Sequence, residues 1–77
     1  MILNVTDVDY MGDYTLGVSF NNGMRKKVDI KPLLTMPAFS ELKDLAKFMQ
    51  YAVFRTIHWS NGADIAPEWL LENGEDY

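Results

Sequence analysis

The sequence predicts a small α+β protein built on an antiparallel β-meander, with one amphipathic helix, one or two later strands and a short C-terminal helix. Three observations lead to this fold class. Apolar and polar residues alternate strictly over residues 14–20, which is typical of a strand with one buried face. After Pro37 the apolar spacing changes to that of a helix. The length of 77 residues allows one domain, residues 1–77, with a thin core.

The meander is predicted as strands at about 2–10, 13–20 and 24–30. Met11-Gly12-Asp13 and Asn21-Asn22-Gly23 separate these strands with residues that favour tight turns. Three strands joined in this way form an antiparallel sheet with one wet face. The residues expected on the buried face are Tyr14, Leu16, Val18 and Phe20, followed by Met24, Val28 and Ile30.

A helix is expected over about 38–49, because Pro32 and Pro37 cannot donate to a strand ladder and a helical spacing follows them. A break near Lys43-Asp44 stays open, since neighbouring surface residues do not fix continuity. The helices are expected to cover one face of the sheet. The side chains predicted to do so are Leu42, Leu45, Met49, Trp59 and Trp69.

Residues 51–59 are predicted as strand, either one bent strand or two short ones, because they are dense in β-branched and aromatic side chains. Asn61-Gly62 then supplies a turn, and Asp64 is expected to tie down that turn or to cap the next helix. That helix is predicted over about 67–72, beginning at Pro67, since proline loses nothing at a first helical position.

The end of the chain carries two weaker expectations. Asn73-Gly74 is expected to end the C-terminal helix with a residue in the left-handed conformation. The last three residues, Glu75-Asp76-Tyr77, are expected to form a loose tail.

Composition argues against several protein classes. There is no cysteine, which removes disulfides and Cys-ligated metals and fits a cytoplasmic protein. Residues 1–7 lack the basic and apolar segments of a signal peptide, and no apolar run approaches membrane-spanning length. The net charge is −4, so phosphate backbones are repelled and nucleic acid is an unfavoured partner.

Few residues are candidates for chemistry. His58 is the single histidine, and a catalytic role would require Asp64 or Glu68 as its partner; a strand position on the face opposite Trp59 is favoured. Three acidic residues near the first turn could together bind a cation, but they lack the ligand spacing of a calcium-binding loop. These residues are Asp7, Asp9 and Asp13. We therefore expect no catalytic, cofactor-binding or metal site, and no enzyme activity.

Arg25-Lys26-Lys27 is the one basic cluster and defines the alternative function, a nucleic-acid-associated accessory domain. On a strand, Lys26 points away from Arg25 and Lys27, which divides the patch. A solvated face is therefore favoured over a nucleic-acid site.

A resemblance to a known family is carried in the front half by Asp13–Gly23 and Val28–Leu34, and in the back half by Phe39–Asp44, Phe48 and above all Thr56–Leu70. The chain resembles, over nearly its whole length, a small bacterial family, domain of unknown function 2442. The most specific residues of this structural motif are Trp59, Asn61, Gly62, Asp64, Pro67 and Trp69. The resemblance implies a small α+β domain with no established activity and no known cofactor. The connection Val53–Thr56 is shorter than the family's usual strand–turn–strand, which leaves the pairing near Arg55 open.

The resemblance also suggests partners. Some relatives carry a helix-turn-helix domain after this one, which implies a sensing or assembly role beside a DNA-binding part. Others are encoded next to small proteins of another obscure family, which implies a paired, toxin–antitoxin-like system. We expect this chain to end at Tyr77 without an appended DNA-binding domain.

The predicted function is a non-catalytic protein-interaction or regulatory module, acting by self-association or through a partner encoded nearby. A short chain covers its apolar surface poorly, and sheet edges pair readily with another chain. No small-molecule substrate is indicated. Met36 and Tyr51 are the candidate interaction residues.

Overall fold

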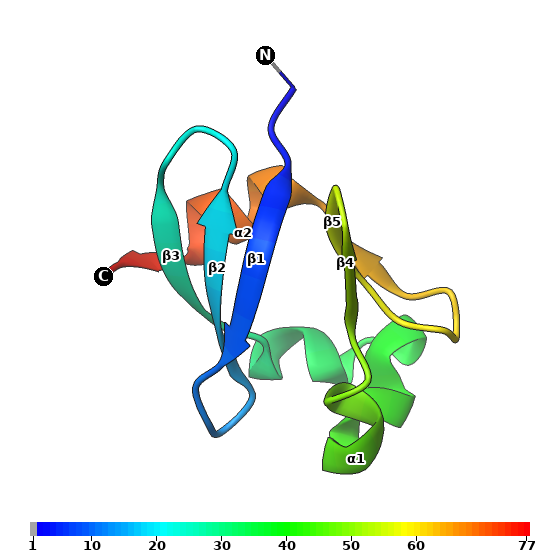
Figure 1. The fold of residues 1–77 in the computed structure, drawn as a ribbon. Coiled ribbons are helices and arrows are strands. Elements are labelled where there is room, and N and C mark those ends of the chain that lie inside the picture. The colour runs from blue at the N-terminus through cyan, green and yellow to red at the C-terminus, as the bar shows by residue number, and fades with distance from the viewer. Residues whose placement is uncertain (1) are drawn as a thin grey trace.

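The first half of the chain forms the predicted antiparallel meander (Figure 1). In the computed structural model, which describes residues 2–77, its strands are β1 (Val5–Tyr10), β2 (Thr15–Phe20) and β3 (Arg25–Asp29). In the first turn Asp13 and Tyr14 both have positive φ, 52° and 59°, as the two central residues of a type I′ turn require. Together with the short helices that follow in the chain, this antiparallel sheet confirms the α+β fold class.

The buried face of the meander also agrees with the alternation in the sequence. Leu16 and Val18 are fully buried, and Tyr14 packs its ring against the core from the turn that precedes β2. The other buried apolar side chains of the meander strands are Val5, Val8, Phe20 and Val28. Met24 is an exception: it is 41% exposed, because it lies in the second turn, before β3 begins.

A continuous helix over 38–49 is not formed, whereas the break that the sequence left open near Lys43-Asp44 is confirmed. The chain instead forms two 3₁₀-helices, η1 (Lys31–Thr35) and η2 (Pro37–Lys43), and one α-helical turn, α1 (Leu45–Phe48). Asp44 interrupts them with an extended backbone, and its Oδ1 accepts a hydrogen bond from Ala46 N at 3.0 Å, which caps α1.

The break at Asp44 also changes which residues are buried. Leu45 and Met49, both predicted to cover the sheet, are 44% and 43% exposed, whereas Phe48 is completely buried. The reason is geometric. A 3₁₀-helix has three residues per turn, and the extended backbone of Asp44 changes which side of α1 faces the core. Leu42, before the break, is buried as predicted.

The segment predicted as strand over 51–59 forms two short strands, β4 (Ala52–Phe54) and β5 (Thr56–His58). A two-residue strand, β6 (Asp64–Ile65), completes a second sheet with the order β4-β5-β6. Arg55 alone connects β4 to β5, with φ of 65°. Its carbonyl accepts a hydrogen bond from Val5 N at 2.7 Å, which joins the second sheet to β1.

The end of the chain is structured, so the loose tail expected for residues 75–77 is wrong. After α2 (Pro67–Asn73), the strand β7 (Glu75–Asp76) pairs with β3 and extends the first sheet to the order β1-β2-β3-β7. The left-handed ending expected at Gly74 is also wrong, since its φ is −93°. Glycine is needed there for close approach: an added Cβ would lie 2.6 Å from Lys26 Cβ.

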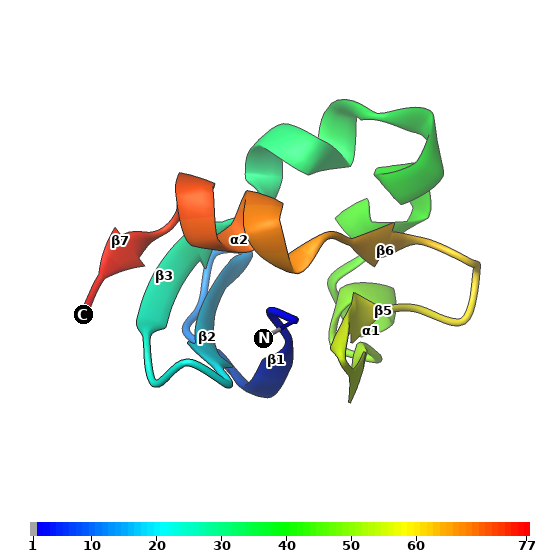
Figure 2. The same ribbon diagram turned by 90° about the horizontal axis from the view of Figure 1, so that it is seen from above.

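The core lies between the two sheets, the 3₁₀-helices and α2 (Figure 2). Phe48 is at its aromatic centre, with its ring centroid 5.0 Å from that of Tyr14 and 5.8 Å from that of Trp59. Trp59 is buried, as predicted, and its Nε1 donates to Phe48 O at 2.9 Å. Trp69, on α2, packs against the core while half-buried.

Candidate functional site

The turn that follows β5 has the geometry that its Asn-Gly pair predicts. Gly62 has φ of 91°, and its N–H donates to Trp59 O at 3.1 Å. Asn61 Oδ1 accepts a hydrogen bond from Ala63 N at 3.0 Å, which fixes the residues after the turn. The motif residues Trp59, Asn61 and Gly62 therefore hold one corner of the fold together.

Asp64 has neither of the roles predicted for it. It lies in β6 with an exposed side chain, and Asn61 rather than Asp64 ties down the turn. Two residues separate it from the helix, and Ala66 occupies the N-cap without a side-chain hydrogen bond. Pro67 begins α2 as predicted, because a proline at that position leaves no N–H to satisfy.

His58 is half-buried in β5, directly opposite Asp64 in the strand register. Within residues 2–77, no side-chain hydrogen bond links His58 to Asp64 or Glu68. The strands thus bring this histidine near a carboxylate without forming the hydrogen-bonded pair that orients a general base.

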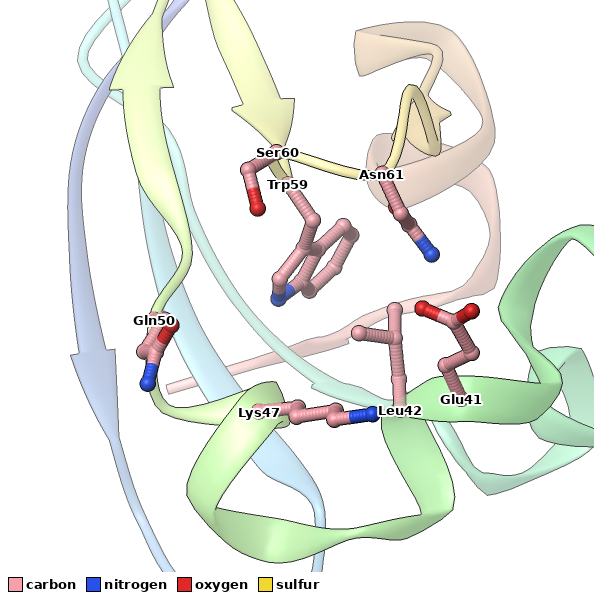
Figure 3. Close-up of a pocket in the computed structure, with 7 residues that line it drawn as sticks. All are labelled: Glu41, Leu42, Lys47, Gln50, Trp59, Ser60 and Asn61. Atoms are coloured by element: carbon pink, nitrogen blue, oxygen red, sulfur yellow. The ribbon is translucent and has the colours of Figure 1, made fainter.

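A small polar pocket lies between the η2–α1 segment and the turn after β5 (Figure 3). Trp59 and Leu42 contribute its apolar surface, and Lys47 extends across it below the indole ring. The other lining residues are Glu41, Gln50, Ser60 and Asn61. Its volume of about 160 Å³ is well below the roughly 300–1,000 Å³ of a typical small-molecule site.

The basic cluster on β3 is largely occupied by the chain's own C-terminus. Lys26 Nζ forms an ion pair with Asp76 at 2.5 Å, and the Lys26 side chain is only 13% exposed. The Arg25 guanidinium lies over the ring of Tyr77, 4.7 Å from its centroid. Lys27 faces Glu75 across the β3–β7 pair. Strand β7 and the residue after it, Tyr77, therefore place two carboxylates and an aromatic ring along this cluster.

The acidic residues near the first turn do not form a cation site. Asp13 pairs with Lys31 Nζ at 2.7 Å, and this hydrogen bond is the main cause that raises the pKa of Lys31. Asp7 and Asp9 lie exposed on β1. Within residues 2–77, no group of three or more metal-binding side chains is arranged to hold an ion.

An apolar groove lies between the 3₁₀-helices and the β6–α2 segment. Its lining residues are Leu33, Met36, Phe39, Asp64, Ile65, Ala66 and Trp69, and it encloses about 250 Å³. Met36, a predicted interaction residue, is 47% exposed here, at the junction of η1 and η2. Asp64 is the one charged residue of the lining. We call this surface the Met36 groove.

Tyr51, the other predicted interaction residue, lies elsewhere. It is half-buried against the core, and its hydroxyl donates to Val8 O at 3.4 Å. Burial, together with the charges of Asp9 and Asp7, raises the pKa of the Tyr51 hydroxyl. The structure therefore places Tyr51 at the contact between β1 and the second sheet, where it has a packing role.

A second exposed apolar surface is the tip of the β4–β5 hairpin. Phe54 is 71% exposed and Val53 is 38% exposed. The Arg55 guanidinium lies 5.4 Å from the centroid of the Phe54 ring. We call Val53, Phe54 and Arg55 the hairpin tip.

Residues 5–76 match the model of the family described as "Protein of unknown function (DUF2442)". The chain belongs to this family. The comparisons of this chain with curated proteins and with solved structures find no match. None of the helices within residues 2–77 has the length and apolar character needed to cross a bilayer.

The sequence predicted only part of the surface that this DUF2442 domain exposes. It identified Met36. Trp69 packs against the core as predicted but also lines the groove, and Phe54 lies in a strand as predicted but is 71% exposed. The sequence feature that could have indicated the exposure of Phe54 is the charged residue next to it. An apolar residue beside Arg55 in a short connection is poorly placed for burial.

Proposed function

We propose that this DUF2442 domain is a non-catalytic protein-interaction module and that the Met36 groove is its binding surface. The groove is the observation that carries the proposal: six of its seven lining residues are apolar, on a chain with net charge −4. Its volume of about 250 Å³ suits one or two partner side chains better than a drug-sized ligand.

The rigidity of the groove supports this role. Met36 connects two helices that each begin with proline within their first two positions, and its N–H donates to Leu33 O at 3.0 Å. The opposite wall comes from the β6–α2 segment, in which Pro67 fixes the start of α2 between the lining residues Ala66 and Trp69. A preformed apolar surface of this kind loses little conformational entropy when a partner binds.

The alternative function, nucleic-acid association through Arg25, Lys26 and Lys27, has weaker support. Asp76 and the ring of Tyr77 already engage two of these three cations. A phosphate would have to compete with them, on a protein whose net charge of −4 repels it.

A paired substitution tests the proposed surface. Met36→Lys puts a charge into the groove, and Met49→Lys is the matched control, because Met36 and Met49 are 47% and 43% exposed on different surfaces. The tagged chain is sedimented over a concentration series, and bound proteins are captured from its own cells. We expect Met36→Lys to abolish association while Met49→Lys retains it.

Salt separates the two functions in the same experiment. Between about 50 and 200 mM salt a nucleic-acid complex loses about 10³–10⁵ in affinity, whereas an apolar interface changes little. Equal association of the two Met→Lys variants would overturn the protein-interaction proposal. Low-salt retention of nucleic acid that Arg25→Ala with Lys27→Ala removes would establish the alternative.

A further inference from the structure

The geometry points to the partner of the Met36 groove: we propose that it binds the hairpin tip of a second copy of this chain. The inference rests on the proposed function, because it names the occupant of that surface. A protruding apolar group on one copy would enter a recess on the next, in a head-to-tail arrangement.

The hairpin tip has the properties of such a protruding group. Phe54 is 71% exposed, the highest exposure of any aromatic side chain in the part of the chain described. All three residues of β4 are exposed, so the strand presents Phe54 on an uncovered surface. Phenylalanine supplies a large apolar contact area with few rotatable bonds, which makes it an efficient anchor in an interface.

The backbone of Arg55 holds the hairpin tip in one position. Arg55 is the single residue between β4 and β5, with φ of 65°, and its carbonyl accepts a hydrogen bond from Val5 N at 2.7 Å. Positive φ is uncommon for a non-glycine residue, and within residues 2–77 only Asp13 and Tyr14 of the first turn share it. The tight connection and this hydrogen bond keep the tip rigid, so Phe54 would lose little conformational entropy when it enters a partner.

Charge matches the hairpin tip to the groove. Within residues 2–77, neither Arg55 nor Asp64 takes part in an ion pair. Arg55 adjoins the apolar Phe54, and Asp64 is the single charged residue lining the apolar groove. Seating Phe54 in the groove brings this cation to that carboxylate, which sets the orientation of the contact.

One copy does not satisfy both surfaces. Figure 2 shows β6 and α2 running between them, with η1 and η2 on one side and the β4–β5 hairpin on the other. The contact is therefore heterologous, so each copy keeps one free groove and one free tip until a ring closes. Because one ring entering one groove is a small contact compared with a standard interface, the association should be weak and should need high protein concentration.

Two variants test this arrangement. Phe54→Ala removes the protruding ring and leaves the groove, whereas Met36→Lys blocks the groove and leaves the ring. Both residues are exposed, so circular dichroism should show unchanged folding. Self-association of purified chain is measured by sedimentation. We expect each variant alone to associate about 30-fold more weakly than wild type, the loss typical of an interface hot spot.

Mixing the two variants is the decisive step. A Met36→Lys chain still offers a tip and a Phe54→Ala chain still offers a groove, so the equimolar mixture should form heterodimers that grow no further. Wild-type chain should instead form larger species as its concentration rises. If each variant is monomeric and the mixture stays monomeric, the head-to-tail contact is wrong.

The test also separates this inference from the proposed function. If Met36→Lys abolishes capture of a different protein while wild-type chain is monomeric at every concentration, the groove is an interface and the second-copy inference fails. If Met36→Lys and Met49→Lys behave alike, the proposed function itself fails.

Discussion

The two sheets of this domain differ in how much of each strand they bury. In the four-stranded sheet every meander strand contributes buried apolar residues, and Gly17 on the opposite face lies beneath Tyr77. In the three-stranded sheet β5 and β6 bury one residue each, Ile57 and Ile65, while β4 buries none. The comparison suggests that the first sheet provides most of the stability and that the second holds the hairpin tip at the surface.

The same substitution in each sheet gives the largest expected difference. Phe20→Ala, at a side chain only 4% exposed in β2, should lower the free energy of unfolding by about 3–5 kcal/mol, because it leaves a cavity. Phe54→Ala, at a side chain 71% exposed in β4, should change it by less than about 0.5 kcal/mol. Urea denaturation at low protein concentration measures both. Similar losses would show that the two sheets contribute equally.

The next effect concerns the attachment of β7 to the first sheet. Gly74→Ala should lower the free energy of unfolding by about 1–3 kcal/mol, the usual range for overpacking. The added Cβ would lie 2.6 Å from Lys26 Cβ and 2.9 Å from the backbone oxygen of Leu70. Urea denaturation measures this loss.

Gly62 is the matched control for Gly74, because it is required for its φ of 91° and has no atom within 4 Å of an added Cβ. At Gly62, Asn should cost less than Ala, since Asn tolerates the left-handed region better. At Gly74 the order should reverse, because the larger side chain clashes more. The same order at both positions would contradict these separate roles.

Much of the first sheet could be predicted from the sequence, because its signals are local. Alternation over residues 14–20 fixes which face is buried, and the Asn22-Gly23 and Asn61-Gly62 pairs fix two turns. Pro67 likewise marks the start of α2. Each of these features depends on residues within a few positions of one another.

The errors arise where tertiary contacts decide the structure. An exposed aspartate such as Asp44 is equally compatible with the middle of a continuous helix and with the N-cap of a new one. The spacing of apolar residues therefore could not show that α1 turns Phe48, rather than Leu45 and Met49, toward the core. A strand as short as β7 has no periodicity to detect, and its pairing with β3 depends on residues about 50 positions apart.

The candidate site was predictable only in part for the same reason. Met36 was identified because a methionine beside Pro37, where the chain leaves the sheet, was expected to be exposed, but the other groove residues come together only through the packing of the 3₁₀-helices against the β6–α2 segment. Phe54 is exposed because β4 ends the second sheet, a position that composition does not reveal.

A smaller effect tests the strain at the hairpin tip. Arg55→Gly should raise the free energy of unfolding by about 0.5–1 kcal/mol, because glycine adopts positive φ without steric cost, partly offset by its greater unfolded-state entropy. The melting temperature should rise by a few degrees. Arg55→Ala is the control, since it removes the side chain but keeps a Cβ at φ of 65°. Equal melting temperatures for the Gly and Ala variants would mean that this backbone carries no strain.

The smallest effect concerns Tyr51, which links the two sheets. Burial and the charges of Asp9 and Asp7 raise its pKa above the ordinary 10.0, so the unfolded chain loses this proton at lower pH than the folded chain does. The contribution of Tyr51 to stability is therefore fully present below pH 10 and is lost as the pH rises through its folded-state pKa. At neutral pH its hydrogen bond to Val8 O, 3.4 Å long, should contribute about 0.5 kcal/mol or less.

Tyr51→Phe isolates this effect, because the raised pKa of Lys31 acts in the same direction in both proteins and cancels in the difference. At about pH 8 the variant should be slightly less stable than wild type, having lost the hydrogen bond. Towards about pH 11 wild type should lose stability faster, so that the difference shrinks and then reverses sign. Urea denaturation at a series of pH values measures it. A difference that stays constant over this range would show that Tyr51 ionises equally in the folded and unfolded chains, and that its contact between the sheets is not a buried one.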